Sequence, residues 1–392
     1  MKAPALLFDA AARAPAAGAA ETASPPLLDR VYAWRDRLLA NPRFQRWAAA
    51  FPLTRPIALR RSRKLFDLCA GFVYTQSLLA CHRTGLVEAL AHGPLHPDAL
   101  PDRLGLDADA CSRLVGAALA LGLAERRPGG RIGLGPLGAP LIGNAAIAAM
   151  LEHDALLYDD LRDPVALLRG GGGTQLSRYW PYAANPSAAR SAASEVGAYT
   201  GLMAASQPLV AAELLDAWDV RRHRALLDVG GGDGAFLRAA AARAPGLRLM
   251  LFDLPAVAER ARLHLRIAGL AERATVHEGD FRADPLPAGA DAATLVRVLH
   301  DHDDDVAMAV LRAVHHALPP GGTLAIAEPM SGVRGAETVG GTYFAFYLLA
   351  MGSGRCRTPD EYRRMLAEAG FRRTRAVRPR LPVQASIVLA TK

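Results

Sequence analysis

The chain has 392 residues, a net charge of +8 and four cysteines. Its length exceeds one average domain, so two domains are expected, and the cysteines lack the paired short spacings of zinc or redox sites. No stretch of 18 uncharged apolar residues and no signal-peptide pattern is present, so we expect a cytoplasmic protein with reduced thiols, neither secreted nor membrane-spanning.

The N-terminal part is expected to be helical after a disordered leader. Residues 1–26 are rich in alanine and proline and show no periodicity, which is typical of disorder. A helical apolar pattern resumes over residues 27–46, and two further helices are expected between Leu65 and Leu90.

Five basic side chains gather between these helices, namely Arg55, Arg60, Arg61, Arg63 and Lys64. Clustered cations are attracted to an anionic membrane surface, which would make this segment a peripheral membrane contact. A solvated linker has the same composition, so both interpretations stay open.

Residues 97–144 follow the order of elements of a winged helix. Short helices are predicted over 97–104 and 109–121, and a hairpin is predicted around Gly129 and Gly130. This pattern alone suggests DNA binding. The helix over 109–121 has few basic side chains to meet phosphates, however, so we expect no nucleic-acid partner.

After helices that bridge residues 145–220, a glycine turn indicates a nucleotide-binding crevice. The run Ala225–Phe236 is an apolar strand, a turn and the start of an alanine-rich helix. Gly230 and Gly232 let the backbone approach a ligand closely, where a Cβ would clash. The run nearly fits the dinucleotide fingerprint, so a nicotinamide enzyme is the first alternative.

Charge beside the turn favours a different ligand. A pyrophosphate binds bare N–H groups at a helix N-terminus, yet Asp228 and Asp233 place two carboxylates there. S-adenosylmethionine carries a sulfonium and an ammonium group, which such carboxylates attract. S-adenosylmethionine is therefore the expected cofactor.

Two further acidic strand ends support the same crevice. A second strand is predicted over 247–252 and ends at Asp253, whose carboxylate can accept both ribose hydroxyls. A third, over 274–277, is followed by Asp280 and Phe281, which could bind the adenine amino group and cover a ring face. Because the carboxyl ends of parallel strands share one edge of a sheet, these side chains are expected to converge.

The chemistry is predicted at the end of the fourth strand, over residues 292–299. His300 follows this strand directly, and an imidazole is the side chain best suited to take up a proton near neutral pH. Asp303, Asp304 and Asp305 stand nearby but open a helix, where acids complement the helix dipole, so no metal site is expected.

A dense apolar helix is predicted over residues 343–351. Core packing is the default interpretation of its aromatic side chains. Its continuous apolar surface would suit a hydrophobic molecule better than a charged one.

Four segments together resemble S-adenosylmethionine-dependent O-methyltransferases of the hydroxyindole and caffeate type: Asp228–Gly234, Phe252–Pro255, Gly279–Phe281 and Arg297–Asp301. The resemblance implies an α/β fold, with a Rossmann-like methyltransferase sheet and an N-terminal, all-helical or winged-helix domain that forms a homodimer. Residues 27–144 would be that dimerisation domain, residues 145–220 bridging helices and residues 221–392 the S-adenosylmethionine-binding catalytic domain.

The resemblance also implies roles for single residues. His300 would be the general base, Glu328 at the end of the fifth strand would orient it, and the helix over 343–351 would lie against the acceptor. One departure is Cys356, which stands where the plant enzymes have a second acidic residue in a G-x-x-E-R-T segment. The residues implied for cofactor binding are Asp228, Gly230, Gly232, Asp253, Asp280, Phe281 and Arg297. Those implied for acceptor binding are Phe344, Tyr347 and Met351.

Residues 52–56 and 65–77 resemble the carotenoid O-methyltransferases of phototrophic bacteria, one branch of this family. This implies a lipophilic acceptor, such as the tertiary 1-hydroxyl of an acyclic carotenoid. The same chemistry on a tetrapyrrole, a polyketide or a phenol is the alternative. A ligand-sensing winged-helix regulator is less favoured, because a sensor would not need His300 beside an intact crevice.

Overall fold

The computed structural model describes residues 27–170, 172–179 and 206–392. The leader expected over 1–26 lies outside the described residues. The chain divides into two compact units, the first ending at Ser77 and the second beginning at Leu78. Across the described ranges, no helix is long and apolar enough to cross a membrane.

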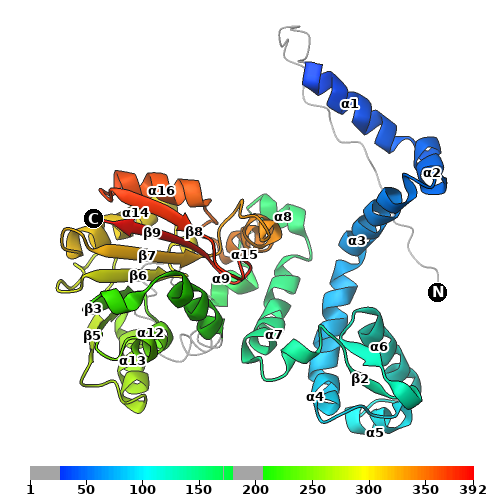
Figure 1. Cartoon of the computed structure of the whole chain (residues 1–392), viewed down its shortest axis with the longest axis horizontal. Coiled ribbons are helices and arrows are strands. Elements are labelled where there is room, and N and C mark those ends of the chain that lie inside the picture. Colours follow the sequence, from blue (N-terminus) through cyan, green and yellow to red (C-terminus); the bar gives the residue numbers. More distant parts are fainter. Residues whose placement is uncertain (1–26, 171, 180–205) are drawn as a thin grey trace. The chain divides into compact units, whose positions relative to one another are not determined.

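The first unit is helical and is coloured blue in Figure 1. It contains α1 (Leu27–Ala40), α2 (Pro42–Ala50) and the beginning of α3 (Arg55–Arg83). The helical pattern predicted over 27–46 forms two helices, because Pro42 begins α2 and the preceding Asn41 is extended. The basic cluster is helical, because it lies on the first part of α3, and all of its side chains are exposed.

The second unit begins with the elements predicted for a winged helix. They are α4 (Leu86–Ala91), α5 (Leu100–Leu104), α6 (Ala108–Ala120) and an antiparallel hairpin of β1 (Ala124–Arg126) and β2 (Ile132–Leu134). Gly129 and Gly130 have φ of 74° and 70° in the hairpin, a backbone that favours glycine. Apolar side chains of the helices pack against Ile132, so this part has a core of its own.

Helices follow over the predicted bridging segment. They are α7 (Ala145–Asp160), α8 (Pro164–Leu168), α9 (Gln175–Tyr179) and a helix over 206–217. Asn144 caps α7 by accepting a hydrogen bond from the N–H of Ile147 at 3.3 Å. Asp160 accepts a hydrogen bond from the N–H of Leu176 at 2.9 Å, which holds α9 against the end of α7.

A seven-stranded sheet in the order β5-β4-β3-β6-β7-β9-β8 forms the centre of the second unit. Strands β3 to β7 run parallel, whereas β9 is antiparallel to both β7 and β8. All five residues of β3 and of β6 are buried, as expected for parallel strands whose two faces are covered. The strands are β3 (Ala225–Val229), β4 (Arg248–Asp253), β5 (Ala274–Glu278), β6 (Ala292–Val296), β7 (Thr323–Glu328), β8 (Arg373–Val377) and β9 (Ser386–Thr391).

Helices cover both faces of this sheet (Figure 1). The helix over 206–217, α12 (Ala235–Arg243) and α13 (Pro255–Ile267) pack on one face. On the other face lie α14 (Asp304–Ala317) and α16 (Pro359–Glu368). The strand order reverses between β3 and β6, where open α/β sheets form a crevice beyond the carboxyl ends of the strands. The predicted α/β class is therefore confirmed.

The fourth parallel strand ends earlier than predicted. β6 stops at Val296, Arg297 has φ of 57°, and a 3-10 turn spans residues 299–301. The N–H groups of the two residues after Arg297 both donate to Oε1 of Glu328 at 2.9 Å, which turns the chain away from the strand direction. Arg297 is the residue that directly follows β6. His300 comes three residues later and lies on the 3-10 turn.

Candidate active site

The glycine turn after β3 leaves room for a ligand. Gly230 has φ of 70°, and a Cβ there would lie 2.8 Å from Cγ2 of Val298. Gly232 has φ of 60°, and no atom of the described residues lies within 4 Å of the place that its Cβ would take. The left-handed backbone favours glycine at both positions, and the close approach of Val298 favours it further at Gly230. The turn thus presents bare backbone at the carboxyl end of β3.

Asp228 lies buried in β3, directly before this turn. Its Oδ1 accepts a hydrogen bond from Oγ1 of Thr294 at 2.7 Å, whereas its Oδ2 has no hydrogen-bond partner among the described residues. Burial raises the pKa of Asp228 to about 7, and the charge of Asp253 adds to this effect. Because buried polar atoms are nearly always paired, this carboxyl group fits a positively charged ligand that supplies the missing donor.

Asp253 ends β4 and contacts the turn from the next strand. Its Oδ2 accepts a hydrogen bond from the N–H of Gly232 at 2.8 Å, and its Oδ1 accepts one from Leu254 at 2.7 Å. Burial raises the pKa of Asp253 to about 6, although these two donors oppose the shift. The N–H of Gly279 donates to the carbonyl of Asp253 at 3.0 Å, so the end of β5 is held at the same place.

Asp280 and Phe281 follow β5 at this edge of the sheet, as the sequence predicts. Asp280 forms an ion pair with Arg282 at 2.7 Å, and the ring of Phe281 lies edge-on to His302 with 5.4 Å between the centroids. Burial acts to raise the pKa of Asp280, but the hydrogen bonds and charge of Arg282 have the larger combined effect. The pKa of Asp280 is therefore lower than usual. The Asp280 carboxylate is therefore ionised and already oriented.

Asp233 differs from the other acidic residues of the crevice. Its Oδ2 lies 3.0 Å from Nδ1 of His264, and its Oδ1 accepts a hydrogen bond from the N–H of Ala235 at 3.1 Å. The side chain thus stabilises the start of α12, and its carboxylate is engaged by the protein. Of the two carboxylates that the sequence places beside the turn, Asp228 is the one with an oxygen that has no hydrogen-bond partner among the described residues.

Arg297 joins the end of β6 to the helix over 206–217. Its Nη1 donates to Oγ of Ser206 at 2.7 Å, and its Nη2 donates to Oε1 of Gln207 at 2.5 Å. The left-handed backbone of Arg297 aims the side chain at this helix. Arg297 therefore lies at the same end of the strands as the glycine turn. It connects the end of β6 with the helix over 206–217.

His300 is buried and held by two carboxylates. Its Nδ1 is hydrogen-bonded to Oε2 of Glu328, and its Nε2 lies 3.1 Å from Oδ1 of Asp301. Glu328 is fully buried, and its other oxygen accepts the two backbone hydrogen bonds already described. Burial lowers the pKa of His300, but the charges of Asp301 and Glu328 outweigh burial and raise it overall.

Asp301 is a site residue that the sequence did not single out. Burial raises its pKa to about 6, against the lowering effect of His300. Cys356, at the position of the second acid in plant enzymes, has its pKa raised by burial to about 12 and stays a neutral thiol. The second carboxylate on the imidazole is thus Asp301, and its place directly after His300 in the chain was the only available signal.

Arg357 is a second residue that the sequence analysis missed. It is fully buried, and its guanidinium donates to the carbonyl of Leu299 at 2.7 Å and to that of His302 at 2.8 Å. It also forms an ion pair with Asp304 at 2.7 Å. These contacts fix the backbone on both sides of His300.

The predicted acceptor helix is α15 (Phe344–Met351), preceded by a π-helical turn over Val339–Tyr343. The ring of Phe344 lies edge-on to His300, with 5.7 Å between the centroids. Tyr347 is hydrogen-bonded to Nε2 of His153 on α7 at 2.7 Å, and Met351 is fully buried among leucines of the bridging helices. The structure thus brings Phe344 to the imidazole, whereas Tyr347 and Met351 pack toward α7, α8 and α9.

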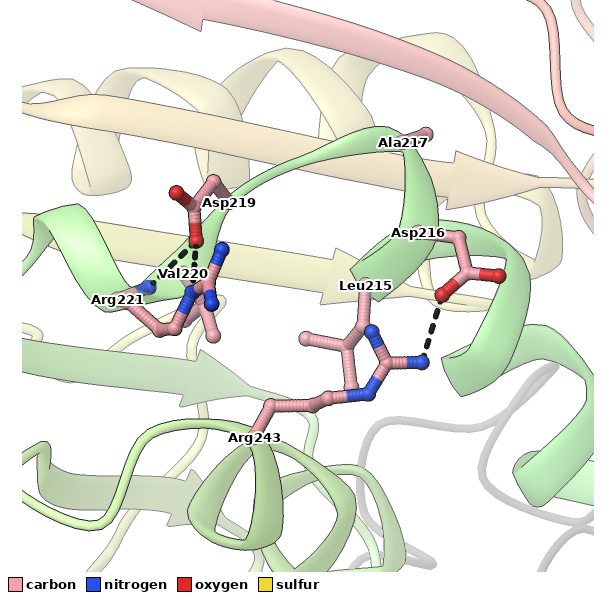
Figure 2. A pocket seen from close by; sticks show the side chains of 7 residues that line it. All are labelled: Leu215, Asp216, Ala217, Asp219, Val220, Arg221 and Arg243. Atoms are coloured by element: carbon pink, nitrogen blue, oxygen red, sulfur yellow. Dashed lines mark hydrogen bonds and ion pairs between the residues drawn. The ribbon is translucent and has the colours of Figure 1, made fainter.

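A separate hollow lies at the amino end of β3 (Figure 2). It is lined by the segment 215–221 together with Arg243. Asp216 pairs with Arg243 at 2.6 Å and Asp219 with Arg221 at 2.7 Å, so its charged groups neutralise one another. This hollow is at the opposite end of the strands from His300, and ion pairs account for its charged groups.

The parallel sheet, the open glycine turn and the unpaired carboxyl oxygen of Asp228 together fit an S-adenosylmethionine-dependent methyltransferase. A family model described as an O-methyltransferase domain matches residues 158–372, more than half of the chain. The chain therefore belongs to the O-methyltransferase family.

Known relatives extend this match over most of the chain. The demethylspheroidene O-methyltransferase of Cereibacter sphaeroides is 43% identical over 91% of this chain and 94% of its own length. That of Rhodobacter capsulatus is 40% identical over 91% of this chain and 88% of its own length. The solved structure of a methyltransferase of calicheamicin biosynthesis with bound SAH has a TM-score of 0.68 and 25% identity, and the match covers 85% of this chain and 98% of that one. The protein is thus an S-adenosylmethionine-dependent O-methyltransferase, as the sequence predicted.

Proposed function

We propose that His300 is the general base in a methyl transfer to a hydroxyl of a lipophilic acceptor. The observation that carries this proposal is the buried imidazole, held through Nδ1 by Glu328 and lying beside the ring of Phe344. Glu328 engages Nδ1, so the hydroxyl proton passes to Nε2 once the acceptor hydroxyl replaces Asp301 as the partner of this nitrogen. The nearby charge of Asp301 then stabilises the imidazolium that results. The apolar ring of Phe344 helps to exclude water from the base.

The cofactor is proposed to bind across the ends of β3, β4 and β5. S-adenosylmethionine, when bound, supplies an electrophilic methyl group on a sulfonium. Asp228 and the glycine turn would hold its positively charged end, and Asp253 would hold its ribose hydroxyls. Asp280 and Phe281 would contact the adenine, while Arg297 supports the neighbouring helix.

The proposed acceptor is the tertiary 1-hydroxyl of an acyclic carotenoid. Support comes from the two relatives whose names specify demethylspheroidene and which match 91% of the chain. A tertiary alcohol is a far weaker acid than a phenol, so His300 has to remove the proton as the oxygen attacks. This requires the hydroxyl and the methyl group to be held about 3 Å apart.

A phenolic, polyketide or tetrapyrrole acceptor is the alternative, and one observation favours it. Two polar pairs lie at α15 and the turn before it: the buried pair of Tyr347 with His153 and the half-buried pair of Tyr343 with Asp154, both at 2.7 Å. An acceptor with several polar atoms could exchange bonds with these groups, whereas a polyene could not. A ligand-sensing regulator is less favoured, because it would not need a held base.

Mass spectrometry of the products decides between these acceptors. The enzyme is supplied with S-adenosylmethionine and either a hydroxylated acyclic carotenoid in detergent or a catechol. A carotenoid that gains one methyl group is the expected result. Efficient methylation of the catechol with an untouched carotenoid would refute the carotenoid assignment and leave the methyltransferase assignment standing.

We further propose that residues 27–144 are a dimerisation domain and that the enzyme is a homodimer. In α3, the stretch after Lys64 contains no lysine or arginine before Arg83 and exposes large apolar side chains. These side chains are Leu65, Phe66, Leu68, Phe72 and Val73. Apolar surface of this extent favours burial against a second copy. Sedimentation should find a dimer, and Leu68→Glu with Phe72→Glu should shift it to a monomer; a wild-type monomer would refute this.

A further inference from the structure

One segment has a surplus of positive charge as large as the net charge of the whole protein. Residues 27–64 contain ten arginine and lysine residues and two aspartates, a surplus of eight that equals the net charge of the whole chain. All ten basic residues are exposed. The remainder of the chain is therefore electrically balanced, and α1, α2 and the first part of α3 form a distinct cationic segment.

Helix α1 carries an exposed apolar stripe on the side away from its two acidic side chains. Leu27, Val31 and Trp34 follow one another at helical spacing and are exposed, and no residue of α1 is buried. At 100° per residue, Asp29 and Asp36 lie on the side opposite this apolar stripe. An apolar stripe with Trp and Leu, next to arginines and away from acids, is the pattern of helices that lie in the interface of a bilayer.

Helix α2 carries a row of aromatic rings. Trp47 stacks on Phe51 with 5.2 Å between the centroids, and Phe44 lies 5.6 Å from Trp47. Trp47 is 52% exposed and Phe51 is 40% exposed, so the row faces outward. Arg43 and Arg46 are on the same short helix. Aromatic rings beside cations suit the boundary between lipid head groups and acyl chains.

We propose that residues 27–64 dock the enzyme on an anionic lipid surface. Charge distinguishes this occupant from a second copy of the chain, because two such segments would face each other with a surplus of positive charge on both sides. The apolar stretch after Lys64, which has no lysine or arginine before Arg83, fits a second copy, whereas the cationic segment before it fits phosphate head groups. This inference goes beyond methyl transfer and does not depend on the identity of the acceptor.

Flotation of the whole enzyme on vesicles tests the proposal. Vesicles of phosphatidylglycerol and phosphatidylcholine should bind the enzyme at low salt and release it at high salt, whereas phosphatidylcholine alone should bind it weakly. Binding should shift the fluorescence of exposed Trp34 and Trp47 to shorter wavelengths. Equal binding to both vesicle types, or no binding, would overturn the proposal.

A charge-matched pair of variants makes the test specific. The docking variant carries Arg60→Gln, Arg61→Gln, Arg63→Gln and Lys64→Gln. Its control carries Arg372→Gln, Arg373→Gln, Arg375→Gln and Arg378→Gln, which removes the same charge from exposed positions on and around β8. Partitioning should fall about five-fold per lost charge, several hundred-fold in all, for the docking variant only.

Two further measurements separate this proposal from its rivals. Methyl transfer to a detergent-dispersed acceptor should be equal in both variants, so a wrong acceptor assignment would not affect the lipid result. Sedimentation should give both variants the same oligomeric state. Loss of the dimer in the docking variant, with vesicle binding equal to that of the control, would make this segment a contact between copies and overturn the proposal.

Discussion

His300 has a carboxylate on each ring nitrogen, and the two carboxylates have different surroundings. Glu328 receives three hydrogen bonds, from the imidazole and two backbone N–H groups, and is fully buried. Asp301 contacts Nε2 and has a pKa raised by burial to about 6. Glu328 therefore fixes the orientation of the ring, and we expect Asp301 to influence how readily Nε2 exchanges a proton.

Replacing His300 by Ala should reduce turnover at least about 100-fold, because the acceptor hydroxyl loses its proton acceptor. The affinity for S-adenosylmethionine, measured by calorimetry, should stay nearly unchanged, since the imidazole is not among the proposed cofactor contacts. His316→Ala, an exposed histidine on α14, is the control. Near-normal turnover of the His300→Ala variant would show that positioning alone drives the transfer.

The pH dependence of turnover should follow His300. Its pKa is raised above 6.5, so the imidazole is protonated and inactive as a base at low pH, and activity should rise with pH through a value above 6.5. Asp301→Asn removes one charge that raises this pKa, so the acid limb of the profile should move to lower pH. A limb that stays in place in the Asp301→Asn variant would mean that Asp301 does not act on His300.

Single residues differ in how far the sequence revealed them. Asp228, Asp253 and Asp280 were predicted because each follows the rule that ligands meet parallel strands at their carboxyl ends, and the structure brings them to one edge. Arg357 could not be predicted, because a buried arginine is distinguished from a surface arginine only by its contacts in space. Asp233 was predicted from its position beside the glycine turn. The sequence could not show that His264 engages its carboxylate.

At the scale of elements, the loop between α15 and α16 holds the turn that carries His300. Ser353 donates to the carbonyl of Asp301 at 2.9 Å, and Gly354 approaches so closely that a Cβ would lie 2.1 Å from the carbonyl oxygen of His300. Arg357 completes the contact from the end of the same loop. The position of the imidazole thus depends on a segment more than fifty residues away, which explains why local periodicity misplaced the end of β6.

Arg357→Met and Arg355→Met test this loop as a matched pair. Both arginines form ion pairs with Asp304. Only Arg357 also donates a hydrogen bond to a buried backbone carbonyl, that of Leu299. Arg357→Met should lower the free energy of unfolding by about 1–3 kcal/mol for carbonyls left without donors. Arg355→Met should cost less than about 1 kcal/mol, as for an exposed ion pair.

The kinetic constants of the Arg357 variants distinguish a positioning role from a purely structural one. Arg357→Lys should lower kcat while the KM for S-adenosylmethionine stays constant, and added guanidinium should restore part of the activity of a smaller variant, Arg357→Ala. Denaturation curves and rates that are the same for the Arg357 and Arg355 variants would refute a positioning role.

At the scale of the whole molecule, the resemblance to methyltransferases implied the α/β class, which the structure confirms, whereas the antiparallel strands β8 and β9 were not predicted. The expected boundaries at residues 144 and 220 stay predictions. The Asn-Pro pair at residues 41–42 indicates a helix break. We did not predict this break, because the apolar periodicity continues beyond it.

Cofactor binding across three strand ends should stabilise the fold as a whole. At 100 times its Kd, S-adenosylmethionine should add about 2.7 kcal/mol to the free energy of unfolding. Asp253→Ala, with an affinity about ten-fold lower, should retain about 1.4 kcal/mol at the same concentration. Asp98→Ala, at an exposed residue of the first half, is the control for thermal unfolding. A full shift in the Asp253→Ala variant would remove Asp253 from the binding site.

The antiparallel strand β9 has a consequence for synthesis on the ribosome. It is the last strand of the sheet to be translated, yet it lies inside the sheet, between β7 and β8. Until residues 386–391 have emerged, β7 is an unpaired edge of apolar residues, the kind of edge that adds strands from other chains. The nascent enzyme therefore carries an aggregation-prone border from the synthesis of β7 until that of β9, and chaperones that shield such borders should determine its yield.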